Sequence, residues 1–199
     1  MKRTFLIALT VLIVCGCQNK EKTDTNIIKT IAEDTLSKTV AGTADVGDAE
    51  AKEDNAVELI QKQLNVLLEK DLPAMKKKER VFYYQAFDLN NDKKEEYFVG
   101  FSNSYFCGSG GCSGYILNND GSVINSFTIT DFPIYITTSS TEKFYDLIFE
   151  TGGKFYIVKM KDGKYPSNPT AQQELTGRGP KESTKVLDIE GKKLEKYSF

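Results

Sequence analysis

The sequence predicts an α+β domain, in which a mainly antiparallel sheet of about six to eight strands carries one N-terminal amphipathic helix packed on it. Three observations lead to this prediction. Apolar residues recur at helical spacing before Pro73, and short runs rich in Phe, Tyr, Ile and Val follow it. The turns between these runs contain glycine and are too short for crossover helices, which favours antiparallel pairing.

The chain begins with a segment typical of an export signal. Two basic residues precede an apolar run from Phe5 to Val14. This run fits a secretory signal peptide and is much shorter than the ~20 residues of a membrane-spanning helix. Gly16 and Cys17 resemble the end of a bacterial lipobox. We therefore predict a signal peptide over residues 1–16 and a lipid anchor, bearing palmitate, on Cys17. The alternative is an ordinary signal peptide that happens to contain cysteines.

Export would change both the charge and the cysteine chemistry. Cleavage before Cys17 removes two basic residues, so 26 become 24 against 28 acidic residues, and the formal charge moves from -2 to -4. This balance argues against a nucleic-acid partner. Cys15 leaves with the signal peptide, so Cys107 and Cys112 remain. An even pair in an oxidising compartment predicts a disulfide.

Residues 17–54 are predicted to form a flexible polar tether. Their small and polar side chains bury too little apolar surface to offset the entropy of ordering. A few isoleucines and a valine between Ile27 and Val40 are loosely spaced for one face of a weak helix. The remaining residues, 55–199, are expected to form a single α+β domain with its own core.

The N-terminal helix is expected from Ala56 to Leu72. Five apolar residues recur at spacings of three and four in this segment: Val57, Ile60, Leu64, Leu67 and Leu68. Asn55 and Glu58 resemble a capping box at its start, and Pro73 ends the pattern.

The strands follow as eight short β-type runs. We predict them over residues 80–87, 97–105, 114–117, 123–130, 144–150, 155–161, 186–189 and 194–197. Glycine-containing turns at Gly121, Gly153, Gly163 and Gly191 separate several of them. Residues 166–185, which contain several glycines and prolines, are expected to form one long loop.

An Asp-rich segment lies between the first two predicted strands. Asp88, Asn90, Asp92 and Glu96 have the one, three, five, nine spacing of calcium-binding loops. However, Lys93 stands where such loops carry glycine, and a site here would be weak, on the order of millimolar. The alternative, which we favour, is a turn whose side chains hydrogen-bond their own backbone. No other cofactor is expected.

The sequence offers no catalytic constellation. Histidine is absent, which removes the usual base of Ser or Cys triads and the commonest neutral zinc ligand. No phosphate loop, dinucleotide fingerprint or serine elbow is present. Paired carboxylates could still cleave glycosides, but no spacing singles out a pair. We therefore predict a protein that is not an enzyme.

The segment YFCGSGGCSGY places four small residues between Cys107 and Cys112. Closing this ring stabilises the fold by about 2 kcal/mol in the chain-entropy model. Redox motifs more often separate their cysteines by two residues, and two thiolates alone make a poor zinc site. A structural disulfide is therefore favoured over a redox or metal centre. The aromatic residues Tyr105, Phe106 and Tyr115 flank the loop and are candidate partner contacts.

Between Arg80 and Tyr165, the segments FDLNNDKKEEYFVGF, FCGSGGCSGYIL, FYDLIF and KMKDGKY occur in this order. This order resembles a group of small exported bacterial proteins and lipoproteins with a DLNxDxxxEY segment, a CGxGGC loop and a DGKxY hairpin. Lys93 departs from the glycine usual in that group. The resemblance implies an exported location and this type of fold. It implies no catalytic residues.

These observations predict a lipid-anchored bacterial envelope lipoprotein that binds another envelope or extracellular protein, with inhibitors and toxin-neutralising factors as examples of the class. The alternative is a carboxylate-dependent envelope hydrolase acting on glycan or peptide. Gln18 after Cys17 favours the outer membrane, and the sequence leaves open which face of the membrane the domain occupies.

Overall fold

A computed structural model describes residues 46–177 and 179–199. The predicted signal peptide, the predicted lipidation site Cys17 and the loosely spaced segment between Ile27 and Val40 lie outside the described residues. Most of the predicted tether lies outside them as well.

The described residues contain one α-helix and ten strands. The helices are α1 (Val46–Leu67) and two short 3-10 turns, η1 (Lys77–Glu79) and η2 (Pro169–Ala171). The strands are β1 (Val81–Phe87), β2 (Glu96–Gly100), β3 (Cys107–Gly108), β4 (Gly111–Leu117), β5 (Val123–Thr141), β6 (Phe144–Thr151), β7 (Lys154–Val158), β8 (Gln173–Glu174), β9 (Thr184–Val186) and β10 (Tyr197–Ser198).

The sheet is antiparallel at every pairing, in the order β10-β1-β2-β4-β5-β6-β7-β8, with β3 on β4 and β9 on β5. The predicted α+β class with a mainly antiparallel sheet is confirmed. The number of strands exceeds the predicted six to eight. The strands β3, β8 and β10 have two residues each and are recognised only through their pairing with β4, β7 and β1, because so short a strand has no sequence period.

Strand β5 connects the two halves of the sheet. Residues 123–130 pair with β4, and the second half, from Asp131 to Thr141, pairs with β6. The predicted strand ended at Thr130, whereas β5 continues to Thr141 although Pro133 lies within it. The structure continues it through an irregular register between Asp131 and Tyr135, which accommodates the proline.

The helix begins earlier than predicted. Residues 46–54, which were assigned to the tether, are helical, and the helix ends at Leu67 rather than Leu72. The sequence there contains two Ala, two Glu and one Lys, which favour helix without supplying an apolar stripe. Among the described residues, no helix is long and apolar enough to cross a membrane.

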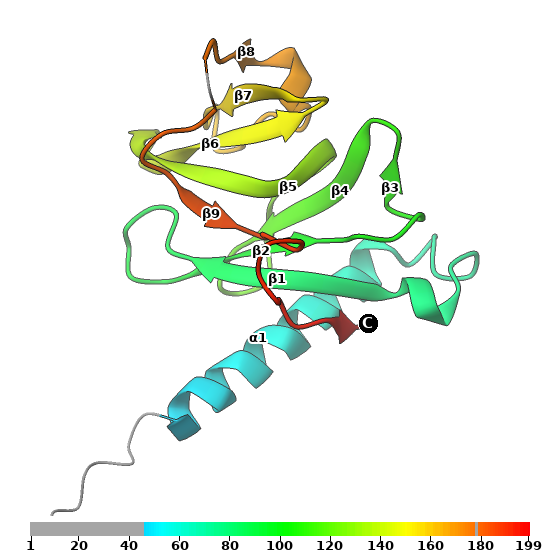
Figure 1. Ribbon diagram of the computed structural model, residues 1–199. Helices are drawn as coiled ribbons and strands as arrows, with labels where there is room; N and C mark the ends of the chain where they lie inside the picture. Colours follow the sequence, from blue (N-terminus) through cyan, green and yellow to red (C-terminus); the bar gives the residue numbers. More distant parts are fainter. Residues whose placement is uncertain (1–45, 178) are drawn as a thin grey trace, which may run out of the picture. The chain divides into compact units, whose positions relative to one another are not determined.

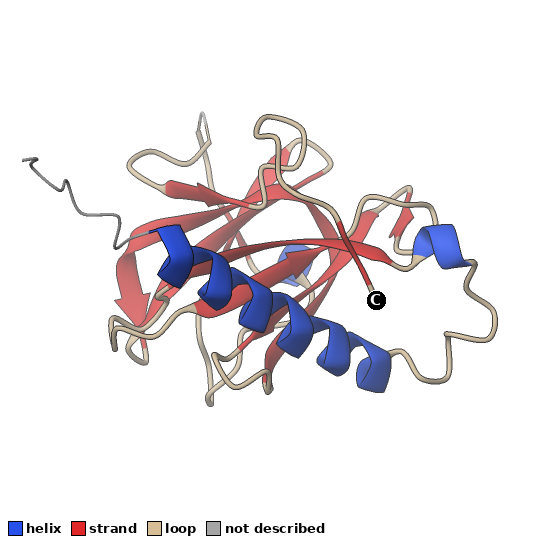
Figure 2. Cartoon of the chain, turned by 90° about the horizontal axis from the view of Figure 1, so that it is seen from below, coloured by secondary structure: helices blue, strands red, loops and turns tan. Residues whose placement is uncertain are grey.

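Helix α1 packs on one face of β1, β2 and β4 (Figures 1 and 2). Ile60, Leu64 and Leu68 are buried there, as their helical spacing predicts, whereas Leu67 is exposed. The strands contribute every second residue to the same cluster, for example Phe82 from β1 and Val99 from β2.

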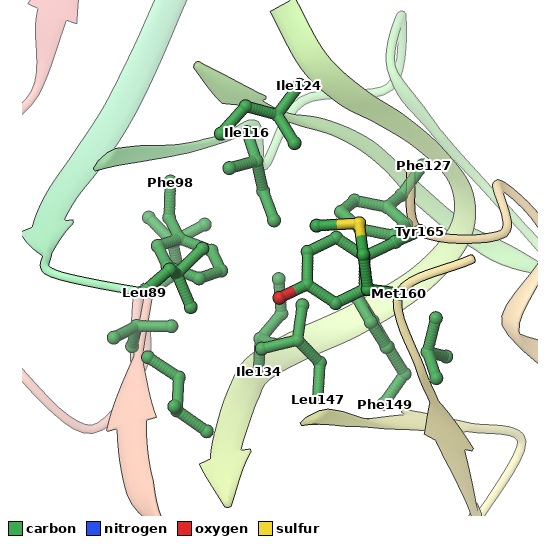
Figure 3. Close-up of a cluster of buried hydrophobic side chains, with 14 of the residues drawn as sticks. Leu89, Phe98, Ile116, Ile124, Phe127, Ile134, Leu147, Phe149, Met160 and Tyr165 are labelled. Atoms are coloured by element: carbon green, nitrogen blue, oxygen red, sulfur yellow. The ribbon is translucent and has the colours of Figure 1, made fainter. Parts of the chain in front are cut away.

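The opposite face of these strands is covered by the second half of the sheet, so that Figure 1 shows α1 on one side of β1 and β2, and β6 and β7 on the other. The alternate residues Phe98 and Ile116 join this second cluster, together with Leu147 and Phe149 from β6. Figure 3 shows these side chains gathered around Tyr165. The Tyr165 hydroxyl donates to the backbone carbonyl of Tyr145 at 2.7 Å, which satisfies its only polar group.

Strand β10 ties the end of the described chain to its beginning. Tyr197 pairs with Phe82 in the sheet, and the backbone N–H of Phe199 donates to the carbonyl of Arg80. The Tyr197 hydroxyl also donates to the carboxylate of Glu53 on α1. The first strand, the helix and β10 are therefore held together.

Candidate functional site

The most constrained surface element is the hairpin of β3 and β4. Cys107 and Cys112 face each other across it and form a disulfide with an S–S distance of 2.12 Å, which confirms the predicted disulfide. Gly111 has a φ of 118°, and a Cβ there would lie 2.7 Å from the backbone nitrogen of Thr130. The loop therefore lies directly against β5.

The three flanking aromatic residues lie in different surroundings. Tyr105 is exposed. Phe106 is buried, and its ring stacks on Phe101 with centroids 3.8 Å apart. Tyr115 points towards α1 and is half-buried in the helix-side cluster.

Phe106 is 9 % exposed, so its ring offers a partner little surface in the described structure. The segment before β3 folds back, because the backbone N–H of Phe106 donates to the carbonyl of Asn103, and this turn directs the ring into the core. Of the three aromatic residues, Tyr105 presents the most surface to a partner. The role of Tyr105 and Tyr115 as contacts stays a prediction.

A pocket of about 460 Å³ lies beside the disulfide. Its lining combines apolar, cystine and acidic groups: Phe101, Ser102, Cys107, Cys112, Asp131, Phe132, Glu150, Ile189 and Glu190. The residues come from the loop after β2, the disulfide hairpin, both halves of the sheet and the segment after β9. The pocket therefore lies where these parts of the fold meet.

Phe132 forms one wall of this pocket because β2 and β4 each carry a glycine beneath its ring. Gly100 and Gly114 are cross-strand partners, and a Cβ on Gly100 would lie 2.7 Å from the Phe132 ring. The two glycines thus leave a slot that seats the ring against β2 and β4.

The acidic side of the pocket is built from a like-charged pair. Asp131 and Glu150 are direct partners in the pairing of β5 with β6, so their side chains share one face of the sheet. One Asp131 oxygen accepts the backbone N–H of Gly152 at 3.3 Å. Like charges in this position destabilise a sheet. Glu190 lines the same pocket and increases the negative charge.

Sequence reasoning identified the two cysteines but missed these three carboxylates. Asp131, Glu150 and Glu190 are far apart in the sequence, and each follows or precedes ordinary strand residues. The pairing of β5 with β6 brings Asp131 and Glu150 together. The sequence did not predict this pairing, because the predicted strand ended at Thr130, one residue before Asp131.

The Asp-rich segment forms the turn between β1 and β2. The two carboxylate oxygens of Asp88 accept the backbone N–H groups of Asp92 and Lys93, at 3.1 and 2.8 Å. Asn90 and Asp92 accept further N–H groups within the loop. These are the hydrogen bonds that the turn interpretation predicts. Lys93 has a φ of 71°, the conformation that favours glycine at this position.

Glu96 lies beneath this turn with 2 % of its surface exposed. Its Oε2 accepts the backbone N–H of Leu89 at 2.7 Å. Burial is the main cause that raises the pKa of Glu96 to about 7; the Leu89 N–H opposes the rise, and the charges of Asp92 and Asp88 contribute to it. In the described part of the chain, no three His, Cys, Asp or Glu residues are grouped as a metal site would require. Calcium binding by Asp88, Asn90, Asp92 and Glu96 stays a prediction.

In comparisons with known proteins, the chain matches no protein-family model, no curated sequence and no solved structure.

Replacing Gly111 by alanine is expected to lower the free energy of unfolding by about 1–3 kcal/mol, because the new Cβ meets the β5 backbone at a positive φ. Gly108→Ala is the matched control in the same loop, because its Cβ meets nothing within 4 Å. We expect this control to change the stability by less than about 0.5 kcal/mol. Urea unfolding of the full-length variants measures both values, and equal stabilities would contradict the close approach of the loop to β5.

The buried Glu96 predicts a falling stability between pH 4.5 and pH 7. Its pKa is about 7 in the folded protein against an ordinary value of 4.5, so the folded state binds the extra proton in this window. The stabilisation is complete below pH 4.5 and is lost as the pH rises through 7, a change of about 1–3 kcal/mol.

Glu96→Gln should flatten this part of the profile, because the amide keeps an acceptor for Leu89 and does not titrate. Glu69→Gln, at an exposed position of the chain, serves as the control and should keep the slope. Urea unfolding at a series of pH values measures the profiles. Parallel profiles for the wild type and Glu96→Gln would show that Glu96 is not the titrating group.

Proposed function

We propose that this protein is a lipid-anchored envelope lipoprotein whose domain binds another protein at the pocket beside the disulfide. The N-terminal signal pattern and Cys17 support the anchor. The disulfide hairpin supports the binding role, because a surface that is rigid before association loses little entropy on binding.

The facing pair of Asp131 and Glu150 is the observation that carries the proposal. Two carboxylates that line one pocket repel each other in the free protein, and a bound cation relieves the repulsion. The cost in stability is therefore offset when a positively charged group binds between them.

The walls of the pocket indicate the shape of that group. Phe132 and Ile189 offer apolar contacts, while the carboxylates lie on the same lining. An arginine or lysine side chain combines an apolar stem with a charged end and can meet both parts of such a surface. We therefore expect a partner that inserts a basic side chain into this pocket.

The test is affinity capture from detergent-solubilised native envelopes with the full-length protein as bait. The double variant Asp131→Asn, Glu150→Gln removes both facing charges and should weaken binding of the captured partner at least about 30-fold. The control, Glu69→Gln with Asp162→Asn, removes two exposed acidic groups outside the pocket and should capture as the wild type does.

A partner lost with the pocket variant and kept with the control supports the site, and higher salt should weaken its capture. A partner captured equally by both variants would move the binding surface elsewhere. Capture of no stoichiometric partner by the wild type would count against the binding function itself.

The alternative function, a carboxylate-dependent hydrolase, is supported by the same pocket. Its lining contains Asp131, Glu150 and Glu190, which together could supply an acid and a base. This alternative predicts turnover of a glycan or peptide substrate that falls at least about 100-fold when one of these carboxylates becomes its amide. A panel of envelope glycan and peptide substrates tests it. Turnover that survives all three single substitutions would eliminate a carboxylate mechanism in this pocket.

A further inference from the structure

A second pocket, of about 200 Å³, lies between α1 and the helix-facing side of β1 and β2. Its lining residues are Lys52, Glu53, Ala56, Tyr84, Ala86, Glu95 and Tyr97. The pocket shares no residue with the one beside the disulfide.

Two tyrosine rings form adjoining walls of this pocket. The rings of Tyr84 and Tyr97 are nearly perpendicular, at 79°, with centroids 6.1 Å apart. Tyr197 packs on the far side of the arrangement, with its ring 5.5 Å from that of Tyr84. Two ring planes that meet at a right angle can both present an aromatic face to one bound group.

Small residues leave the space between these walls open. Ala86 is the direct cross-strand partner of Tyr97, and it lies on the same strand face as Tyr84. Ala56 is the helix residue above them, and it is buried. A larger side chain at either alanine would occupy the pocket, so the free volume is a direct result of these two residues.

The charges around the pocket are net negative. Glu53 and Glu95 line it together with one cation, Lys52, which gives a sum of -1. Lys52 is bound to Glu95 at 2.6 Å and keeps 69 % of its side chain exposed. Burial raises the pKa of Tyr84 to about 12, so its ring carries no charge at neutral pH.

We propose that this pocket binds a methylated ammonium group, such as the trimethylammonium of choline. Aromatic faces attract a cation through the negative charge of the ring quadrupole, and the attraction increases when water is excluded. Methyl groups spread the positive charge over an apolar surface, which matches walls made of tyrosine rings and alanine. Glu53 and Glu95 add attraction at the rim.

Lys52 competes with the bound ligand for the carboxylate of Glu95. Its ammonium group holds one of the two rim carboxylates, and the bound ligand shares that carboxylate or displaces the lysine. Because Lys52 is largely exposed, removing its charge does not disturb the core and increases the negative potential of the pocket.

The first experiment compares choline with its uncharged tert-butyl analogue, using calorimetric titration of the full-length protein. The two ligands have the same shape and differ in charge. Binding of choline at least about tenfold tighter than its analogue is the expected result. Equal binding of the two, or no binding of choline, overturns the proposal.

Substitutions then locate the binding. Tyr84→Leu and Tyr97→Leu should each weaken choline binding about tenfold, whereas Tyr84→Phe and Tyr97→Phe keep the ring and should bind as the wild type does. Lys52→Gln should bind choline about twofold to fivefold more tightly. Choline binding that none of these variants changes would place it elsewhere and overturn the assignment.

A free solute and a lipid headgroup share this chemistry, and a displacement assay separates them. Choline that phosphatidylcholine vesicles displace, and phosphatidylglycerol vesicles do not, identifies the headgroup as the ligand. Choline that neither vesicle displaces identifies a soluble ligand. Both outcomes support the methylated ammonium site.

Discussion

The burial of β1, β2 and β4 on both faces is the constraint on which the rest of the structure depends. Strand geometry places successive side chains on opposite faces, so a strand covered twice must supply two apolar sets. Phe82 and Val99 contact the helix side, while Phe98 and Ile116 contact the second half of the sheet. Helix α1 covers one of these faces. Strand β5 is long enough to pair with both β4 and β6, so the second half of the sheet covers the other face. Both pockets lie at the borders of these covered faces. The smaller one is beside α1, and the one beside the disulfide is where the two halves of the sheet meet.

Local pattern predicted the parts of this fold that short stretches of sequence determine. The helical repeat at Ile60 and Leu64 and the glycine turns gave the correct class and pairing direction, because apolar spacing and turn chemistry are local properties. The helix start at Val46 was missed because residues 46–54 form helix without an apolar stripe. The second half of β5 was missed because Pro133 is a strong local signal against a strand, and tertiary pairing with β6 overrides it.

The candidate site shows the same division. Cys107 and Cys112 were identified because their separation of five positions and the predicted export signal restrict the chemistry open to them. Asp131, Glu150 and Glu190 carry no such signature, since what relates them is a cross-strand register and a loop position. The burial of Phe106 was not evident from the sequence for a related reason: Tyr105 beside it is exposed, but the turn through Asn103 directs the Phe106 ring onto Phe101. The tyrosines of the second pocket, Tyr84 and Tyr97, lay in predicted strands. The alternation of a strand predicts which face of the sheet a side chain occupies, but it does not predict that a pocket forms there.

Strand β10 has a consequence for when this molecule can fold. Glu53 and Tyr197 are 144 positions apart in the sequence, and β1 pairs on its outer side with Tyr197 and Ser198. During synthesis from the N-terminus, the outer edge of β1 therefore stays unpaired with β10 until residues 197–199 have been added. Contacts of such long range are slow to form, because the loop they close costs entropy before any contact is gained. The local pairings of β1 with β2 and of β2 with β4 can therefore form first, and the outer edge of β1 is the last part of this half of the sheet to be covered.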